Sequence, residues 1–212
     1  MMPGEKPEQA PIAAILAGGR GTRLGGTDKA LLDWAGEALI LRVARRLRPH
    51  CRRIVVIARG DLGRFQSLGL AAIADRTDLP LAGARLGLAT AFGLLDRVGA
   101  DDLLLTTPTD LPDLPFDLVW RLKRAMAATN APAACAASAD HMHPLVALWT
   151  ADGAKRALAH FAACPDSSAM LLHRAIGSAI ARFAARPRDP FHNVNRPEDL
   201  PSDARFRPSP SP

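Results

Sequence analysis

Apolar runs of strand length alternate along this chain with longer segments in which apolar residues recur at a helical period. Strands are expected at residues 12–17, 53–58, 70–75, 102–107, 133–137, 144–149 and 180–184, and helices at 37–47, 61–68, 82–98, 116–128 and from 152 onward. Such alternation is typical of βαβ units. It predicts an α/β protein whose mostly parallel sheet is flanked by helices.

Length and composition are those of a single folded domain. The chain has 212 residues, of which 48% are hydrophobic, and this is enough for one buried core. Both ends are rich in Pro, Ser, Glu or Arg. We therefore expect disordered tails at residues 1–10 and 203–212 around a domain at residues 11–202.

A glycine-rich loop follows the first expected strand. In the stretch LAGGRGTRLGGTDKALL, residues 16–32, backbone N–H groups can approach an anion closely, and Arg23 and Lys29 can neutralise a triphosphate. Walker A requires Ser or Thr after its lysine, where Ala30 stands, and the dinucleotide pattern requires glycine at Leu24. Neither fingerprint fits. A glycine-rich turn that only leads into a helix is the structural alternative.

Two carboxylates and two amides extend this candidate site. Asp75 and Asp110 each follow an expected strand, and the carboxyl ends of parallel strands meet at one edge of a sheet. Asp110, held between two prolines, is suited to bind Mg²⁺ among phosphates, although aspartate beside proline is also common in turns. Asn193 and Asn195 have strand spacing, so both amides can face a heterocycle or else close a loop.

The charge balance favours small anionic ligands. Lys and Arg number 27 against 21 Asp and Glu, which gives a formal net charge of +6. Proteins that grip nucleic-acid strands usually add aromatic stacking platforms, yet aromatic residues make up 5% and tyrosine is absent. No apolar run reaches the roughly 20 residues of a membrane span. We therefore expect phosphorylated small molecules as partners, with neither nucleic acid nor membrane.

Cysteine and histidine spacing gives neither a disulfide framework nor a usual metal signature. The three cysteines are far apart and form no CxxC pair, so a reducing cytoplasm fits best. His141 and His143, with Asp140 and Cys135 nearby, match no usual zinc spacing. We expect the other histidines at the surface or at helix ends; they are His50, His160, His173 and His192. No GxSxG elbow is present, so a hydrolytic nucleophile is not visible.

Several motifs occur together in one order. They are LAGGRGTRLGGTDKALL, LAG at 81–83, TDLPDLP around Asp110, HPLVAL at 143–148 and FHNVNRPEDL at 191–200. In this order they resemble the molybdenum cofactor guanylyltransferase (MobA) family of nucleotidyltransferases over nearly the whole expected domain. The resemblance implies a Rossmann-like, three-layer nucleotidyltransferase fold, with a mostly parallel sheet flanked by helices.

The same resemblance implies a reaction and its residues. GMP would pass from GTP to the terminal phosphate of molybdopterin or Mo-molybdopterin, giving molybdopterin guanine dinucleotide and pyrophosphate. It implies Arg23, Lys29 and Asp110 as catalytic, Asp110 as the Mg²⁺ ligand, and Asn193 with Asn195 as pterin-binding. The implied nucleotide-binding residues are Leu16, Ala17, Gly18, Gly19, Lys29, Asp75 and Asp110. Molybdopterin-synthesis proteins and apo-molybdoenzymes are the implied protein partners.

Two departures from the family pattern leave the choice between GTP and CTP open. Many members read PGPLAG where this chain has Leu79 in place of the glycine, and a family asparagine aligns with Ile57. A cytidylyl-transferring relative, or a nucleotidyltransferase acting on a sugar phosphate, would use the same loop and metal. A non-catalytic carrier of the finished cofactor would need the pterin surface but not Lys29 and Asp110. The presence of both residues favours the enzyme.

Overall fold

Seven strands form the central sheet of the computed structural model, which describes residues 10–18, 28–97, 102–194 and 199. In chain order they are β1 (Ile12–Leu16), β4 (Arg53–Ala58), β5 (Ala71–Ala74), β6 (Leu104–Pro108), β7 (Ala133–Ser138), β8 (His141–Trp149) and β9 (Ala179–Phe183). They lie side by side in the order β5-β4-β1-β6-β8-β7-β9, and β8 alone among them runs antiparallel to its neighbours. The predicted mostly parallel sheet is confirmed.

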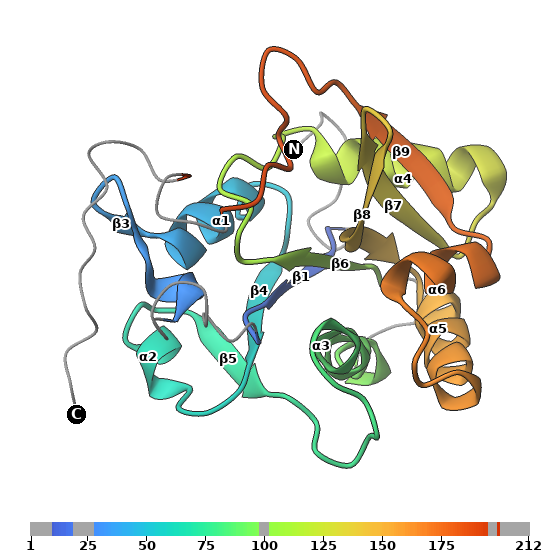
Figure 1. Cartoon of the computed structure of the whole chain (residues 1–212), viewed down its shortest axis with the longest axis horizontal. Helices are drawn as coiled ribbons and strands as arrows, with labels where there is room; N and C mark the ends of the chain where they lie inside the picture. Colours follow the sequence, from blue (N-terminus) through green and yellow to red (C-terminus); the bar gives the residue numbers. More distant parts are fainter. Residues whose placement is uncertain (1–9, 19–27, 98–101, 195–198, 200–212) are drawn as a thin grey trace.

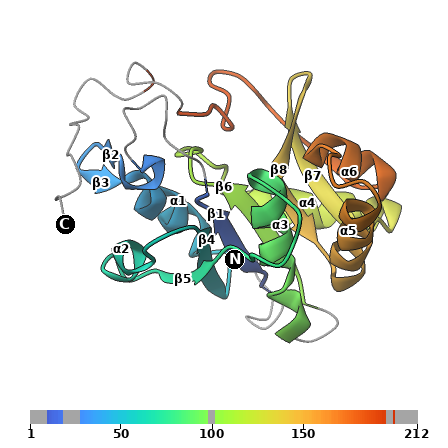
Figure 2. The same ribbon diagram turned by 60° about the horizontal axis from the view of Figure 1, so that its bottom comes forward.

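Helices cover both faces of this sheet (Figures 1 and 2). α1 (Leu39–Leu47) and α4 (Leu118–Thr129) lie on one face, whereas α3 (Ala84–Phe92), α5 (Ala151–Ala163) and α6 (Ala169–Ala175) lie on the other. The shorter elements are α2 (Gly63–Gln66), the 3-10 helices η3 (Lys29–Leu31) and η4 (Leu95–Arg97), and the strand pair β2 (Asp33–Trp34) and β3 (Glu37–Ala38). The chain therefore has the expected three layers.

Strand β1 runs through the middle of the core with both of its faces buried. Ala13 and Ile15 pack with apolar residues of α1 and α4, whereas Ile12, Ala14 and Leu16 pack with those of α3, α5 and α6. A strand buried on both faces needs apolar residues at every position, which is why IAAIL is an unbroken apolar run. Each large apolar side chain buried in this way stabilises the fold by about 1.5–3 kcal/mol.

The helix expected at residues 37–47 begins later than predicted, at Leu39. Residues 37–38 instead pair antiparallel with residues 33–34, as β3 and β2. The connecting turn places Ala35 at φ 53° and Gly36 at φ 85°, and the Gly36 N–H donates to Asp33 Oδ1 at 2.7 Å. This tight turn keeps residues 37–38 extended, although their polar and apolar pattern continues that of α1.

Two further elements have bounds that differ clearly from the prediction. The helix expected at 82–98 is shorter, because Gly83 at φ 58° precedes α3 and the helix ends at Phe92, before η4. The strand expected at 144–149 is longer and begins at His141, since its first residues pair with the end of β7 across a short hairpin turn.

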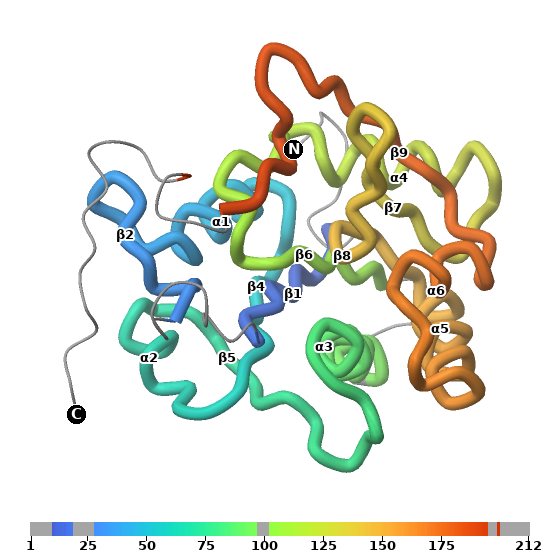
Figure 3. Tube along the Cα trace, viewed as in Figure 1, coloured from blue at the N-terminus to red at the C-terminus, as the bar shows by residue number. Residues whose placement is uncertain are grey.

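The segment that follows β9 returns to the carboxyl end of β6. In Figure 3 this red segment crosses from β9 toward the loop after β6. The Val194 N–H donates to the Asp110 carbonyl at 2.9 Å, and Val194 is buried against Leu32, Trp34 and Leu39. Leu32, Trp34 and Leu39 thereby meet Val194, a residue far from them in the sequence, beside β6.

Candidate active site

The site is built where β1, β4, β5 and β6 end, at what we call the carboxyl edge of the sheet. Leu16, the last residue of β1, pairs in register with residues of both β4 and β6. Parallel strands in register end side by side, so the loops that follow them share this edge. Those loops carry Gly18, Arg59, Asp75 and Asp110.

Lys29 and Asp110 form an ion pair at the carboxyl edge. Lys29 Nζ lies 2.7 Å from Asp110 Oδ2, and the two side chains are 16% and 15% exposed. The other carboxylate oxygen, Asp110 Oδ1, is buried and has no hydrogen-bond partner in the described part of the chain. A buried carboxylate oxygen without a partner is unfavourable by itself. Asp110 Oδ1 is therefore available to a ligand or a metal ion.

Asp75 follows β5 and faces Arg59. Its side chain is 6% exposed, and its Oδ2 lies 3.4 Å from Arg59 Nε. Oδ1 is buried without a hydrogen-bond partner among the described residues. The Thr90 hydroxyl donates to the Leu86 carbonyl at 2.8 Å. Burial raises the pKa of the Asp75 carboxyl, and Arg59 opposes that rise. A second buried carboxylate oxygen is thus available at this edge.

Gly18 lies directly against the Asp75 carboxylate. A Cβ at this position would be 3.3 Å from Asp75 Oδ2, closer than an ordinary van der Waals contact. A residue without a side chain allows the backbone after β1 to come this near. Backbone N–H groups in such a loop can then face an anionic ligand.

The C-terminal segment borders the site at Asp110. The hydrogen bond from Val194 to the Asp110 carbonyl holds the preceding residue, Asn193, beside the loop after β6. Val194 is buried and Asn193 is exposed. Asn193 therefore lies at the border of the carboxyl edge.

Most residues that the sequence singles out come together at this edge. They are Leu16, Ala17, Gly18, Lys29, Asp75 and Asp110, with Asn193 at the border. Gly19, Arg23 and Asn195 lie outside the described residues, as do the expected tails apart from Ala10. Their predicted roles stay predictions.

Two arginines at this edge are absent from the sequence prediction. Arg59 follows β4 and pairs with Asp75, while Arg64 of α2 donates from Nε to Asp28 Oδ2 at 2.7 Å. The position of Arg59 directly after a strand is a signal that could have found it, as it found Asp75. Arg64 has no such signal, because only the folded chain brings α2 to the end of the glycine loop.

A second polar cluster lies where β7 ends and β8 begins. Ser138 Oγ lies 2.7 Å from His143 Nε2 and donates to Asp189 Oδ2 at 2.9 Å. The His143 ring packs on Phe191 with the ring centroids 4.5 Å apart. Burial lowers the pKa of His143, and Asp189 opposes that effect. The polar side chains of this cluster are therefore partnered with one another.

The histidines and Cys135 show no metal site in the described ranges. No group of three or more His, Cys, Asp or Glu side chains that could hold an ion occurs there. Burial raises the pKa of the Cys135 thiol to about 12, so this thiol stays protonated. Arrangement of the histidines around a zinc ion is therefore not supported.

His173 lies at a helix end, one of the two places expected for it, but it is not at the surface. It is in the last turn of α6 but is only 2% exposed. Its Nδ1 lies 2.8 Å from Ser178 Oγ and its Nε2 lies 2.8 Å from the Pro144 carbonyl. Its ring also stacks on Trp149 at 4.8 Å between centroids. Because burial disfavours the charged ring, the pKa of His173 is lowered.

Comparison with known proteins gives this arrangement a family. The family described as MobA-like NTP transferase domain matches residues 13–182. The chain belongs to this family. Among MobA-like relatives, the molybdenum cofactor guanylyltransferase of Rhodopseudomonas palustris (strain BisB5) is 39% identical over 208 residues, which cover 93% of this chain and 94% of that one. The molybdenum cofactor guanylyltransferase of Rhodobacter capsulatus is 42% identical over 190 residues, covering 88% and 90%.

Solved structures of other nucleotide-handling proteins share the fold of this MobA-like chain. Molybdopterin-guanine dinucleotide biosynthesis protein A from Archaeoglobus fulgidus matches with a TM-score of 0.66 at 20% identity, over 89% of this chain and 94% of that one. CMP:2-keto-3-deoxy-manno-octonic acid synthetase complexed with CTP matches with a TM-score of 0.64 at 17% identity, over 90% and 94%. The predicted Rossmann-like nucleotidyltransferase fold is confirmed.

The MobA-like chain is an enzyme, a nucleotidyltransferase. Its family generally uses a divalent metal ion in handling nucleotides. Within the described ranges, none of the helices has the length and apolar character that a membrane crossing requires.

Proposed function

We propose that this MobA-like enzyme transfers GMP from GTP to the terminal phosphate of molybdopterin, or of Mo-molybdopterin, and releases pyrophosphate. The observation that carries the proposal is the Lys29–Asp110 pair, a cation beside a carboxylate whose Oδ1 is buried without a partner in the described chain. Relatives at 39% and 42% identity, named molybdenum cofactor guanylyltransferases, support guanylyl transfer as the reaction.

The oxygen atoms at Asp110 fit a divalent metal ion, and Mg²⁺ is the ion we propose. Mg²⁺ in nucleotide sites is usually held by one or two protein carboxylates, with phosphate oxygens and water as its other ligands. Asp110 Oδ1 meets this need, because it is buried and lacks a partner among the described residues, while Lys29 holds Oδ2. The bound ion would neutralise charge on the nucleotide phosphates.

On the nucleotide side, we assign contacts to the glycine loop and to both unpartnered carboxylates. The proposed binding residues are Leu16, Ala17, Gly18, Gly19, Lys29, Asp75 and Asp110. Backbone N–H groups of the loop would hold phosphate oxygens, and the Lys29 ammonium would neutralise them. Asp75 Oδ1 can accept a hydrogen bond from the nucleoside, which would supply the partner that this buried atom lacks among the described residues.

The acceptor phosphate requires no general base. A phosphate monoester has its second pKa near 6, so it is mostly dianionic at neutral pH. One of its oxygens forms a bond to the α-phosphorus of GTP, while the bond from that phosphorus to the bridging oxygen breaks and its electron pair leaves with pyrophosphate. The protein must align two anions and screen their repulsion, which we assign to Lys29 and Arg23.

The acceptor would approach from the side of the C-terminal segment. Asn193 is exposed beside the Asp110 loop, and we assign the pterin contact to Asn193 and Asn195. The net charge of +6 suits two anionic substrates. The cysteines Cys51, Cys135 and Cys164 are free, which supports a reducing cytoplasm as the compartment. Molybdopterin-synthesis proteins and apo-molybdoenzymes are the proposed protein partners.

Pyrophosphate release tests this function. The assay contains Mg²⁺, molybdopterin with molybdate, and either GTP or CTP, and compares wild type with Asp110→Ala. Asp113→Ala is the matched control, because Asp113 belongs to the same loop but is paired with Arg42 at 2.8 Å. We expect release with GTP that is lost in Asp110→Ala and kept in Asp113→Ala. Release with CTP instead would contradict guanylyl transfer, and release with neither nucleotide would contradict transfer to molybdopterin altogether.

A further inference from the structure

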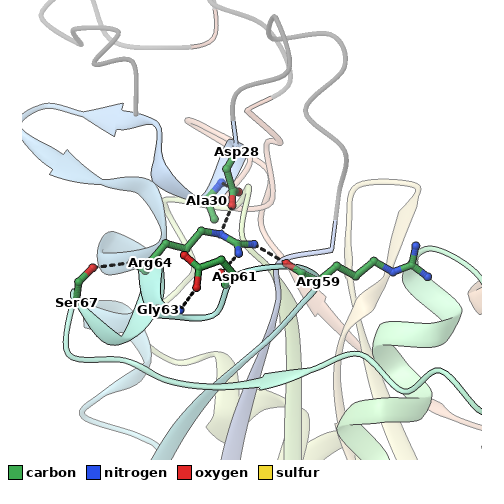
Figure 4. A network of polar contacts seen from close by, with 7 residues as sticks. All are labelled: Asp28, Ala30, Arg59, Asp61, Gly63, Arg64 and Ser67. Carbon is green, nitrogen blue, oxygen red and sulfur yellow. Dashed lines mark hydrogen bonds and ion pairs between the residues drawn. The ribbon is translucent and has the colours of Figure 1, made fainter. Parts of the chain in front are cut away.

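Asp28 and Arg64 hold the start of η3, next to the proposed nucleotide site (Figure 4). Asp28 directly precedes Lys29, and its two carboxylate oxygens have different partners. Oδ1 accepts from the Ala30 N–H at 3.0 Å, and Oδ2 accepts from Arg64 Nε at 2.7 Å. The first bond caps η3, and the second ties that cap to α2. Arg64 also binds the carbonyl groups of Arg59 and Asp61. We call this cluster of Asp28, Arg64 and the two carbonyl groups the Arg64 bracket.

Arg64 is held on several sides within this bracket. Its Nη2 donates to the Arg59 carbonyl at 2.9 Å, and its Nη1 donates to the Asp61 carbonyl. Its guanidinium carbon lies 4.3 Å from the ring centroid of Phe65, which is fully buried. A guanidinium presents its donors in a rigid, planar fork, so several acceptors together fix its position. The Arg64 guanidinium is therefore fixed by several contacts at once, unlike an exposed arginine that forms a single ion pair.

The 3-10 helix η3 needs such support from outside. It spans three residues, Lys29–Leu31, and a helix this short forms too few hydrogen bonds to be stable alone. Lys29 carries its ammonium on a flexible stem of four carbons. A fixed backbone origin is needed if that ammonium is to lie reproducibly 2.7 Å from Asp110 Oδ2. The Asp28 cap fixes that origin, and Arg64 fixes the cap.

The bracket also reaches the loop after β4. Figure 4 shows the Arg59 carbonyl directed at Arg64, while the Arg59 side chain extends away from it. That side chain is the one whose Nε lies 3.4 Å from Asp75 Oδ2. Arg64 thus joins the segment before Lys29 to the loop that carries the cation beside Asp75.

We propose that Arg64 is a positioning residue of this enzyme, which acts through Asp28 to place the Lys29 ammonium for contact with the nucleotide phosphates. This inference rests on the proposed role of Lys29 at those phosphates. Arg64 does not itself touch the reacting groups in this scheme. Its contribution to nucleotide binding and turnover should therefore vanish when the Lys29 ammonium is removed.

A double-mutant cycle between Arg64 and Lys29 tests the inference. Arg64→Met removes the donor fork but keeps an unbranched stem over Phe65, and Asp28→Asn keeps the cap acceptor while it removes the charge that Arg64 binds. Both are compared with Lys29→Met and with the double variant Arg64→Met/Lys29→Met. Arg156→Met is the matched control, because it removes an exposed ion pair of the same kind, between Arg156 Nε and Asp152 Oδ2 at 2.7 Å. This pair belongs to α5, which lies on the opposite face of the sheet from α1 (Figure 1). kcat, KM and the dissociation constant of the Mg²⁺–nucleotide complex are measured for each.

We expect Arg64→Met and Asp28→Asn each to lower kcat by about 10- to 100-fold, since a small misplacement of a catalytic group has effects of this order. In the Lys29→Met background, Arg64→Met should change kcat by less than about twofold, because coupled residues are not additive. Arg156→Met should match wild type. A loss in the double variant equal to the product of the two single losses would overturn the inference, and so would an Arg64→Met variant as active as Arg156→Met.

The measurements of nucleotide dissociation constants test this inference independently of the proposed function. The cycle on dissociation constants uses whichever of GTP and CTP wild type binds more tightly, and it needs no molybdopterin. If guanylyl transfer fails but nucleotide binding shows the same coupling between Arg64 and Lys29, the positioning role holds while the proposed reaction is wrong. If wild type binds neither nucleotide, Lys29 has no phosphate to contact and the positioning role is wrong as well.

Discussion

Because β7 runs parallel to β6, the carboxyl edge continues to the end of β7 and the start of β8. The two halves of this longer edge differ in how their polar groups are hydrogen-bonded. In the half formed by β1, β5 and β6, Asp75 and Asp110 each keep one buried carboxylate oxygen without a partner among the described residues. In the half formed by β7 and β8, Ser138 bonds to both His143 and Asp189, so that cluster is closed on itself. Aspartate oxygens thus lack a hydrogen-bond partner in one half, whereas the polar side chains of the other half bond to one another.

The difference shows that polar residues near a strand end do not by themselves mark a site. A buried polar atom without a partner destabilises the fold by about 1–3 kcal/mol, whereas a fully bonded network adds rigidity. An arrangement that retains such unpartnered atoms is explained if a ligand completes it. The half that carries Asp75 and Asp110 is therefore the half to which we assign substrate binding, and the Ser138 cluster is assigned to structure.

The largest expected effect on activity comes from removing the charge of the Asp110 carboxylate in the open half. Asp110→Asn should lower the rate of pyrophosphate release by about 10³-fold, because it removes the proposed metal ligand and the charge that Lys29 contacts. The melting temperature should change by no more than a few degrees, since the amide oxygen can still accept from Lys29 and the amide nitrogen takes the place of the oxygen that has no partner among the described residues. Steady-state kinetics and thermal unfolding of the same preparation measure both. A large loss of stability would place Asp110 with the structural half.

The reverse result is expected for the closed half. Ser138→Ala leaves the Asp189 carboxylate and the His143 ring without their shared partner, which should lower the free energy of unfolding by about 1–3 kcal/mol. For a chain of this size that corresponds to roughly 2–10 °C in Tm. Affinity for the nucleotide should stay within about twofold of wild type. Thermal unfolding measures the stability, and calorimetric titration measures the nucleotide affinity. A weaker nucleotide complex would show that the closed half also contributes to nucleotide binding.

A smaller effect is expected in the open half where the Gly18 backbone contacts the Asp75 carboxylate. Gly18→Ala would place a Cβ 3.3 Å from Asp75 Oδ2, so the loop or the carboxylate must shift by a few tenths of an ångström. We expect about a tenfold weaker nucleotide complex, equivalent to roughly 1.4 kcal/mol. Calorimetric titration measures the dissociation constant. Unchanged affinity would show that the backbone after Leu16 does not contact the nucleotide.

The smallest effect contrasts Asp75 of the open half with His173, which is buried against β8, by the sign of the change in stability with pH. Burial lowers the pKa of His173, so below its ordinary pKa of 6.5 the unfolded chain binds a proton that the folded chain resists, and stability falls as pH drops. Burial raises the pKa of Asp75 above 3.8, so the folded chain takes up the proton first and stability rises as pH falls through that raised pKa.

Tm measured from pH 8 to pH 4 for wild type, His173→Gln and Asp75→Asn tests these signs. His173→Gln should flatten the decline below about pH 6.5, leaving the part due to His143, whose pKa is also lowered. Asp75→Asn should remove the opposing gain at lower pH and should be more stable than wild type near neutrality by a few degrees. An Asp75→Asn variant with a lower Tm at pH 7 would mean that the Asp75 carboxylate is well satisfied in the folded chain.

Local pattern was sufficient for most of the fold. β1 was predicted because a strand buried on both faces has apolar residues at every position, and α1 because its arginines and apolar residues separate onto two faces. The prediction was wrong at residues 37–38, where a turn through Ala35 and Gly36 overrides a continuing helical pattern. It placed His173 at the surface or at a helix end, and the ring is at a helix end. Its burial was not predicted, because no local signal states that Trp149 and Pro144 will enclose it.

For the site, residue type and position along the chain were enough to propose several candidates. Asp75 and Asp110 follow predicted strands, Lys29 belongs to the glycine loop, and Asn193 has strand spacing with Asn195. The fold decided which of their atoms have partners. The pairing of Lys29 with Asp110, the approach of Gly18 to Asp75, and the hold of Arg64 on Asp28 join residues that are distant along the chain. Such contacts depend on register, burial and side-chain direction, and these are properties of the packed molecule that spacing along the chain does not encode.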